Sequence, residues 1–196
     1  MDLHEAWDRV LKWYMTNVPA DQIHFGSGAT DEDIDAFEKR LGVCVSPEMR
    51  ESYKIHNGVA WCGLLDLGQL LDLIGIEKEY LFFKSCCERL GNGENANRAT
   101  FCRCKPGDGV KRILWSPLRL PLTDNQSGDH YMLDQDPDEN GIKGQIIYYD
   151  HETGPESLEA PSFGAWVASM VGKLEKGKWY FDDEYERVMD RDKDYS

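Results

Sequence analysis

The residues most capable of chemistry in this sequence lie between Pro121 and Asp138, in the stretch PLTDNQSGDHYMLDQDPD. This stretch contains five aspartates and one histidine, and it contains no lysine or arginine. Carboxylates beside an imidazole can ligate a metal ion, act as an acid and a base, or present negative charge to a partner. The spacing of the acids, and the elements that carry them, decide between these uses.

The alternating acids Asp134, Asp136 and Asp138 resemble the start of a calcium-binding loop. Such a loop needs a glycine at its sixth position for a sharp turn and a bidentate glutamate at its twelfth. These positions hold Glu139 and Gln145 in this sequence. We therefore expect no calcium site.

Two Asp-His dipeptides form a second pattern, Asp129-His130 and Asp150-His151. If the strands that carry them pair as a hairpin, Asp129 falls opposite Asp150 and both dipeptides share one sheet edge. Two carboxylates and two imidazoles at one place could hold a metal ion and a water, as in a hydrolase. Adjacent residues of a strand point to opposite faces, however, so each dipeptide offers only one member to either side.

A simpler interpretation of the same stretch is that its polar residues build turns. Asp124 and Asn125 are typical of side-chain turns, and Gly128 supplies a permissive backbone. The remaining acids would then form a solvated, negatively charged surface.

Histidine and cysteine elsewhere in the chain give no stronger signal. His56 is interpreted as an imidazole at a helix end that contacts a carbonyl, in preference to a catalytic base. The pairs Cys86-Cys87 and Cys102-x-Cys104 lack the spacing of a zinc site, so we predict free thiols for all six cysteines. The chain carries no nucleophile elbow and no Walker loop, and we predict no catalytic residue, no bound metal and no cofactor.

The charge of the chain limits its partners. Its 36 acidic and 22 basic residues give a net charge of -14, which opposes binding to nucleic acid or anionic membranes and favours a basic protein partner. Residues 121–140 carry six acids and no base, whereas residues 84–112 carry seven bases and three acids. No apolar run is long enough for a membrane span or a secretory signal, so we expect a cytoplasmic protein. The residues predicted to contact the basic partner are Asp124, Asp129, Asp136, Asp138 and Glu139.

Hydrophobic periodicity and capping residues predict three helices in the first part of the chain. One spans about residues 3–17, one follows Thr30 and ends at Gly42, and one begins at Ser46-Pro47. Residues 61–73 have a mixed pattern that fits a strand followed by a turn or short helix, and residues 74–90 are predicted to be helical.

The second half of the chain has the pattern of an antiparallel meander. The segments RLPL, DHYMLD, GQIIYYDH and SLEA are short, rich in branched and aromatic residues, and separated by turn residues. The two central segments are expected to pair as a hairpin that places Asp134 near Gln145, with helices on at least one face of the sheet. Ser162 is expected to cap a further helix. Beyond Gly172, Trp179, Tyr180 and Phe181 are predicted to pack on the body of the protein, and the charged last stretch is predicted to be a short surface helix. The predicted core includes Trp115, Leu133, Ile147, Tyr149 and Trp166.

The order of several segments is similar to a known family. They are TDEDIDAFEKRLG, VSPEMRESYKIHNG, WSPLRLPLTDNQSGDHYMLDQDP, KGQIIYYDHE and APSFGAWV, which lie between about Thr30 and Val171. In this order and spacing they resemble the SUKH superfamily, named partly for the fungal Smi/Knr cell-wall regulators.

The resemblance implies a fold and a mode of action. It implies one α+β domain over residues 1–196, with a family core at about 30–171, an acidic extension at 172–196, and helices packed on a mostly antiparallel sheet of about five to six strands. Bacterial members are similar to immunity proteins that bind nuclease or deaminase toxins, and fungal members act as signalling scaffolds. No shared catalytic set carries over, so the matching Gly128, Asp129, Asp134 and Gly144 are interpreted as scaffold. The segment 86–112 and the tail after Gly172 depart from the family and could carry partner specificity.

The sequence therefore predicts a non-enzymatic binding protein, first an immunity protein that neutralises a cognate basic toxin domain. The alternative is a regulatory or scaffold protein of the cell-wall-regulator type. A third alternative is a metal-dependent hydrolase that uses Asp129, His130, Asp150 and His151.

Overall fold

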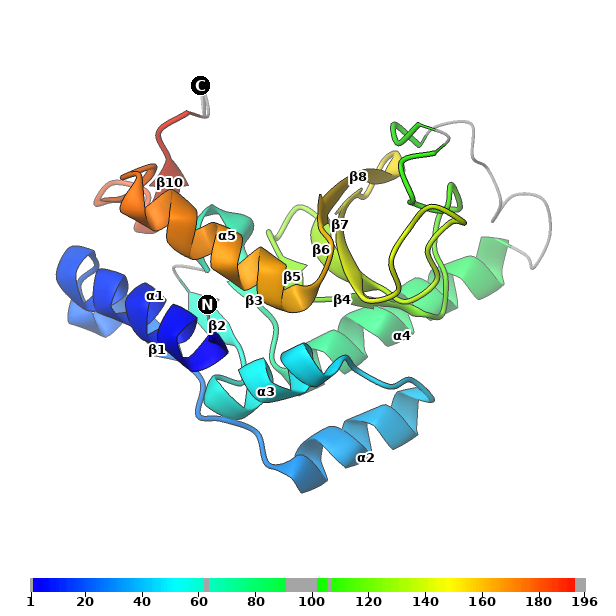
Figure 1. Ribbon diagram of the computed structural model, residues 1–196, viewed down its shortest axis with the longest axis horizontal. Helices are drawn as coiled ribbons and strands as arrows, with labels where there is room; N and C mark the ends of the chain where they lie inside the picture. Colours follow the sequence, from blue (N-terminus) through cyan, green and yellow to red (C-terminus); the bar gives the residue numbers. More distant parts are fainter. Residues whose placement is uncertain (1, 62–63, 91–101, 106, 193–196) are drawn as a thin grey trace.

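Figure 1 shows the helices of the structure. Three of them begin at the capping residues that the sequence predicts, which are Thr30, Ser46 and Ser162. The computed structural model describes residues 2–61, 64–90, 102–105 and 107–192. Thr30 and Asp33 form a reciprocal capping box, in which the Asp33 amide donates to Thr30 Oγ1 over 3.1 Å and the Thr30 amide donates to Asp33 Oδ2 over 3.0 Å. The α-helices are α1 (Leu3–Asn17), α2 (Asp31–Leu41), α3 (Pro47–Ile55), α4 (Leu73–Leu90) and α5 (Phe163–Glu175), and the 3-10 turns are η1 (Ala20–Gln22) and η2 (Leu65–Leu67).

The strands fall into two four-stranded antiparallel sheets and a hairpin. The first sheet has the order β1-β2-β3-β5, the second has the order β4-β6-β7-β8, and β9 pairs with β10. The α+β class is thus confirmed, with the strands divided between sheets where one sheet of five to six was expected. The strands are β1 (Ile23–Phe25), β2 (Val59–Trp61), β3 (Gln69–Leu70), β4 (Arg119–Pro121), β5 (Thr123–Asp124), β6 (His130–Asp134), β7 (Gln145–Asp150), β8 (Gly154–Ala160), β9 (Trp179–Asp182) and β10 (Arg187–Asp190).

Leu122 joins the two larger sheets. Its carbonyl accepts from the Leu71 amide over 2.9 Å, and its amide donates to the Tyr131 carbonyl over 2.7 Å. The segment 119–124 therefore lies between β3 and β6, and it contributes β4 to one sheet and β5 to the other.

The register of the central hairpin agrees with the prediction. Asp134 pairs with Gln145 and His130 pairs with Tyr149, so Asp129 lies opposite Asp150. This places the two Asp-His dipeptides at the same end of the β6–β7 hairpin.

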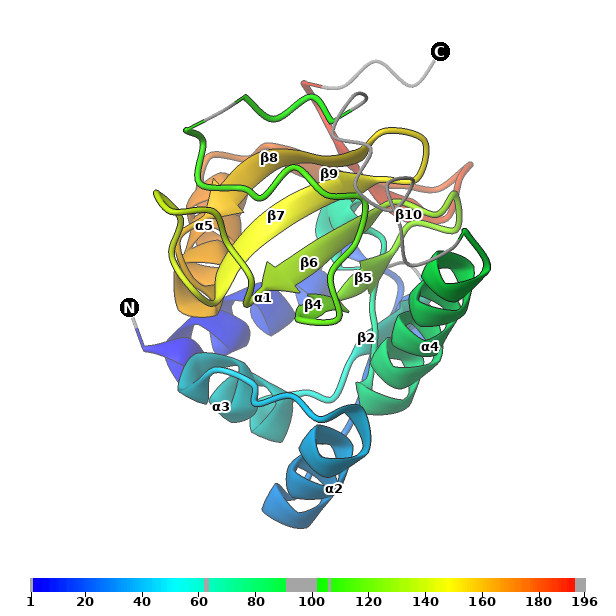
Figure 2. The same cartoon turned by 90° about the vertical axis from the view of Figure 1, so that its right-hand side faces the viewer.

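Helices cover both faces of this hairpin, and Figure 2 shows α5 and α4 on its two sides. On one face Tyr131 meets Trp166 of α5 with ring centroids 5.6 Å apart. On the other face Phe83 of α4 contacts Tyr149 at 5.2 Å and stacks on Trp115 at 6.2 Å. The five residues predicted for the core, Trp115, Leu133, Ile147, Tyr149 and Trp166, are all buried.

Helices α1 and α3 complete the core on the α5 side, and α2 packs against α4. Helix α1 packs against α5 and α3, as the side-by-side placement of α1 and α5 in Figure 1 indicates. The Trp7 indole donates to Ser52 Oγ over 2.8 Å, and the Tyr53 hydroxyl donates to the Leu71 carbonyl over 2.9 Å. Both aromatic rings are fully buried, so their polar atoms need these partners.

The predicted packing of Trp179 on the body is confirmed, but the prediction of a surface helix in the charged stretch that follows is wrong for the described residues. The chain continues from α5 into the hairpin β9–β10, in which Trp179 and Val188 are buried. Trp-Tyr-Phe favours a strand, and Asp182 Oδ1 accepts from the amides of Glu184 and Tyr185 over 3.0 Å to form the turn. The charge pattern concealed this because charged side chains also occupy exposed strand positions.

Two further elements bear on the sequence predictions. The mixed segment 61–73 forms the end of β2, then η2 and β3, in line with a strand followed by a turn or short helix. The short strand β1, which pairs with β2, was not predicted. Among the described residues no helix is long and apolar enough to cross a membrane.

Candidate functional site

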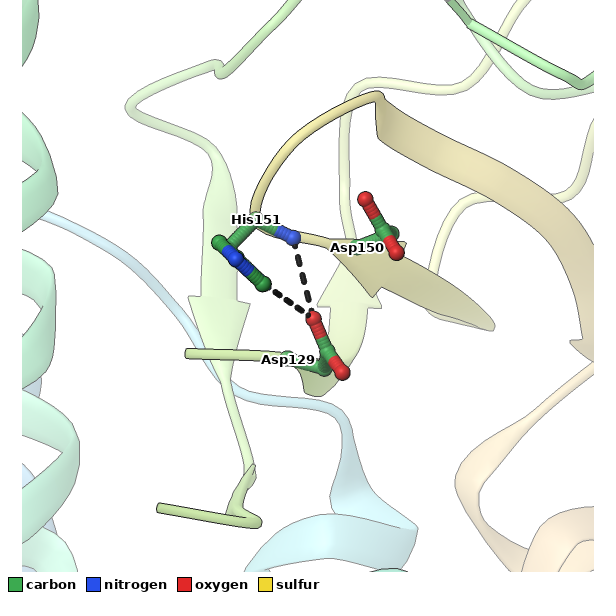
Figure 3. Close-up of side chains that lie close together, drawn as sticks. All are labelled: Asp129, Asp150 and His151. Atoms are coloured by element: carbon green, nitrogen blue, oxygen red, sulfur yellow. Dashed lines mark hydrogen bonds and ion pairs between the residues drawn. The ribbon is translucent and has the colours of Figure 1, made fainter. Parts of the chain in front are cut away.

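Asp129, Asp150 and His151 come together at one end of the β6–β7 hairpin (Figure 3). Asp129 precedes β6, Asp150 ends β7, and His151 begins the following turn. A ligand atom from each lies within 4.8 Å of the others, and within the described ranges this is the one such group of three histidine, cysteine or acidic residues. The geometry is therefore close enough to be tested as a metal or acid-base site.

The Asp129 carboxylate is already occupied by protein donors. Its Oδ1 lies 3.0 Å from the His151 amide and 2.8 Å from His151 Nδ1. Its Oδ2 accepts from Asn125 Nδ2 over 2.9 Å and from the Tyr148 hydroxyl over 3.2 Å. Because each carboxylate oxygen offers about two acceptor sites, these four contacts use the capacity of Asp129.

The same contacts set the ionisation of this pair. Partial burial opposes ionisation of Asp129, but the hydrogen bonds from His151, Asn125 and Tyr148 outweigh it and lower the pKa of the carboxyl. The hydrogen bond to Asp129 in turn raises the pKa of His151. Asp129 is thus held as an anion, and it favours the charged imidazole beside it.

Asp150 serves the neighbouring turn. Its Oδ1 accepts from the amides of Glu152 and Thr153 over 2.9 and 2.8 Å, and from the Thr153 hydroxyl over 3.0 Å. Figure 3 shows the Asp129–His151 contacts as dashed lines and none from Asp150 to either residue. Asp150 therefore fixes the β7–β8 turn by itself, as an Asx turn does.

The second histidine of the predicted hydrolase set lies on the other face of the sheet. His130 is buried, its Nδ1 contacts the Thr123 carbonyl, and its ring meets Phe83 at 5.2 Å. The alternation of strand residues separates it from Asp129 and His151, as expected from the sequence. A metal ion at this cluster would have to displace hydrogen bonds that hold two turns, so the donor set fits a structural role better than a metal.

Asp134, at the other end of β6, belongs to a buried ion pair. Arg119 Nε donates to Asp134 Oδ1 over 3.2 Å, and Gln145 Nε2 donates to Asp134 Oδ2 over 3.0 Å. The other Arg119 nitrogens donate to the carbonyls of Ile113 and Lys111. This network ties the segment 111–119 to the hairpin, which agrees with the interpretation of Asp134 as scaffold.

Asp136 is also engaged by that segment. Its carboxylate accepts from the Lys111 ammonium and from Ser116 Oγ, the latter over 2.8 Å. Partial burial opposes ionisation, but these hydrogen bonds outweigh it, so the pKa of Asp136 is lowered. The acid-rich stretch thus gains bases from outside the interval 121–140, which a count along the sequence does not reveal.

The five residues predicted to contact a basic partner fall into two groups. Asp124 and Asp129 lie at one end of β6, and the others lie beyond its far end. The five-residue strand between them spans roughly 17 Å at about 3.3 Å per residue. Glu139 is exposed and Asp138 is half-buried, so the acidic loop, defined here as residues 136–139, presents these two side chains outward.

His56 and the cysteines have structural surroundings. His56 ends α3, its Nδ1 lies 3.4 Å from the Gly26 carbonyl, and its ring packs edge-on against Trp7 and Phe25. This position and contact confirm the prediction of a helix-end imidazole beside a carbonyl, and burial lowers the pKa of His56.

The five described cysteines are free. Cys62 lies outside the described residues, as do residues 91–101 and 106 of the divergent segment 86–112.

A groove that no sequence pattern predicted lies between the first sheet and the start of α4. It has a volume of about 620 Å³, and β1, β2, β3, Asp124 and the residues Asp72, Gly75, Lys78 and Glu79 line it. Its parts come from five separated stretches of the chain. No motif spans them, so only the pairing of the strands could have located it.

Comparison with known proteins identifies relatives of this chain. The model of the SMI1 / KNR4 family (SUKH-1) matches residues 28–169. The chain is 25% identical over 189 residues to the "Cell wall biosynthesis/cell cycle regulator smi1" of Schizosaccharomyces pombe, covering 92% of this chain and 38% of that protein. It is 21% identical to the "Glucan synthesis regulatory protein" of Neurospora crassa, covering 91% and 40%, and 22% identical to the "Cell wall assembly regulator SMI1" of Saccharomyces cerevisiae, covering 91% and 42%.

The alignments therefore span about two fifths of the length of these relatives. The family match covers more than half of this chain and includes all the segments that carry the resemblance. The chain belongs to the SMI1 / KNR4 (SUKH-1) family.

Proposed function

We propose that this chain is a non-enzymatic, protein-binding regulatory module. The observation that carries the proposal is the family match over residues 28–169, together with relatives that are named as regulators of cell-wall or glucan synthesis. These names support the regulatory alternative of the sequence analysis. They give no support to the immunity-protein interpretation.

The chemistry of the candidate site is compatible with a non-enzymatic role. Asp129 itself is not free to act as a general base, because its acceptor capacity is used by Asn125, Tyr148 and His151. His130 lies on the opposite face and contacts a carbonyl. Both observations favour a scaffold over a hydrolase.

The charge of the chain supports a basic protein as the partner. The net charge is -14, and in the acidic loop Asp138 and Glu139 form no ion pair with another described residue. Complementary charge chiefly accelerates encounter between two proteins, so the acidic surface would steer a basic partner toward the chain.

The test is to identify and then reconstitute the complex. Proteins that co-purify with the tagged chain from the native host are identified, produced separately and titrated into the chain by calorimetry. We expect a saturable complex of fixed stoichiometry whose affinity falls as salt rises. Asp129→Asn serves as the control for catalysis. The proposal is contradicted if no co-purifying protein binds and wild type, but not Asp129→Asn, turns over a small substrate.

A further inference from the structure

The groove beside the first sheet has one wall of strand residues in register. His24 pairs with Ala60, and Gln69 pairs with Asp124. The pairing of Val59 with Leu70 places Ala60 opposite Gln69, so all four residues form one row across the sheet. These four side chains are exposed or half-buried, and all of them line the groove.

The other wall is one face of α4. Gly75, Lys78 and Glu79 line the groove at helical spacings of three and four. Phe82 lies one turn further along the same face and is 56% exposed, which is unusual for a large aromatic side chain. Phe82 is not part of the groove lining, but its spacing from Lys78 and Glu79 places it on the helix face that forms this wall.

Two contacts hold the groove in shape. Asn57 Oδ1 accepts from the Leu73 amide over 3.0 Å, which fixes the end of α3 to the start of α4. Gly58 has φ of +90°, and a Cβ at this position would lie 2.8 Å from the Asp72 amide. The wall therefore requires glycine here, and the strand and helix approach each other too closely for a side chain.

The charges of the lining are unbalanced. Three carboxylates, those of Asp72, Glu79 and Asp124, face one ammonium, that of Lys78. Asp72 Oδ1 accepts from the Gly75 amide and Asp124 Oδ1 accepts from the Gln126 amide, so each acid has a second oxygen to offer. Glu79 forms no ion pair with any other residue of the described ranges.

We propose that this groove binds a lysine- or arginine-bearing segment of the basic partner. The inference rests on the proposed function and names the surface and the chemistry of its ligand. A volume of about 620 Å³ lies within the roughly 300–1,000 Å³ of ligand sites. The carboxylates of Glu79 and Asp124 meet the cationic heads, and Phe82 packs against an aliphatic stem or attracts the cation with its ring.

The test uses a defined probe and a matched pair of variants. The probe is an acetylated and amidated decapeptide of alternating lysine and serine, with the glutamate–serine decapeptide as its comparator. The groove variant is Glu79→Gln/Asp124→Asn, which keeps the shape of both side chains and the acceptor for the Gln126 amide. The control variant, Glu51→Gln/Asp183→Asn, removes the same charge from two exposed acids outside the groove.

Titration of the isotope-labelled chain followed by amide chemical shifts gives the site and the affinity. We expect the lysine peptide to shift the amides of His24, Ala60, Gln69 and Glu79. The groove variant should weaken its binding about three- to tenfold, because it removes two ion pairs that solvent partly screens. The control variant should change the affinity less than twofold, and the glutamate peptide should not bind.

Three results would overturn the inference. Equal weakening by both variants would show only general attraction to an acidic surface. Shifts confined to the acidic loop would place the binding site there. If the lysine peptide did not bind at all, the groove would have no preference for cationic segments. The reconstituted complex separates these failures from failure of the proposed function, because a complex that forms and ignores the groove variant contradicts the groove alone.

Discussion

Arg119 and Asp134 form an ion pair whose side chains are both fully buried, with Nε 3.2 Å from Oδ1. Asp134→Ala would leave the guanidinium buried without its counter-ion, which should lower the free energy of unfolding by roughly 3–5 kcal/mol. Urea denaturation of wild type and Asp134→Ala measures this loss of stability. Replacing both residues by apolar ones, as in Arg119→Met/Asp134→Leu, should recover only part of the loss, because the Ile113 and Lys111 carbonyls lose their donor. An Asp134→Ala midpoint equal to that of wild type would contradict the network.

Trp166 anchors α5 on the sheet through its contact with Tyr131 of β6, with ring centroids 5.6 Å apart. Trp166→Ala should therefore lower the unfolding free energy by roughly 3–5 kcal/mol. Exposed Met15 provides the control, since Met15→Ala removes a side chain that is 71% exposed and should have little effect. Denaturation midpoints that fall equally for both variants would contradict this packing.

The Asp129–His151 pair predicts a dependence on pH. The pKa of His151 is raised by the hydrogen bond to Asp129, so this contact stabilises the fold fully below about pH 6.5, the unfolded value. Its contribution is lost as pH rises through the folded pKa. Imidazole titration by NMR should show a pKa above 6.5 for His151, returning toward 6.5 in Asp129→Asn. An identical titration in both proteins would rule out the pair.

The saturated acceptors of Asp129 predict that the chain needs no metal. Addition of EDTA, calcium or zinc should leave the melting temperature unchanged, and elemental analysis after dialysis should find no stoichiometric metal. A bound metal whose removal lowers the melting temperature would contradict the structural role of this cluster.

The sequence predicted those parts of the fold that local chemistry determines. The caps at Thr30 and Ser46 start α2 and α3, and short segments of branched and aromatic residues between turn residues give β6 and β7 in the correct register. The hairpin β9–β10 was missed because β10 has only the adjacent apolar residues Val188 and Met189 between charged residues, with no alternating pattern.

The candidate site was predicted less completely, since its contacts join distant segments. Asp136 lies in a stretch without bases, yet Lys111 reaches it from another segment. The register that brings Asp129 beside Asp150 could be inferred from the strands, but the contacts that saturate Asp129 could not. The groove depends on the long-range pairing of β1, β2, β3 and β5, for which short strands give little sequence signal.

The central claim is that the chain binds a basic protein through charge. It is tested most directly by the association rate with the purified partner, measured by stopped flow from low to high salt. We compare wild type with the groove variant and with Asp138→Lys/Glu139→Lys in the acidic loop. The wild-type rate should fall steeply as salt rises, and both variants should associate more slowly with a flatter salt dependence while their melting temperatures stay near wild type. A wild-type rate that is independent of salt, and unchanged in both variants, would contradict the claim.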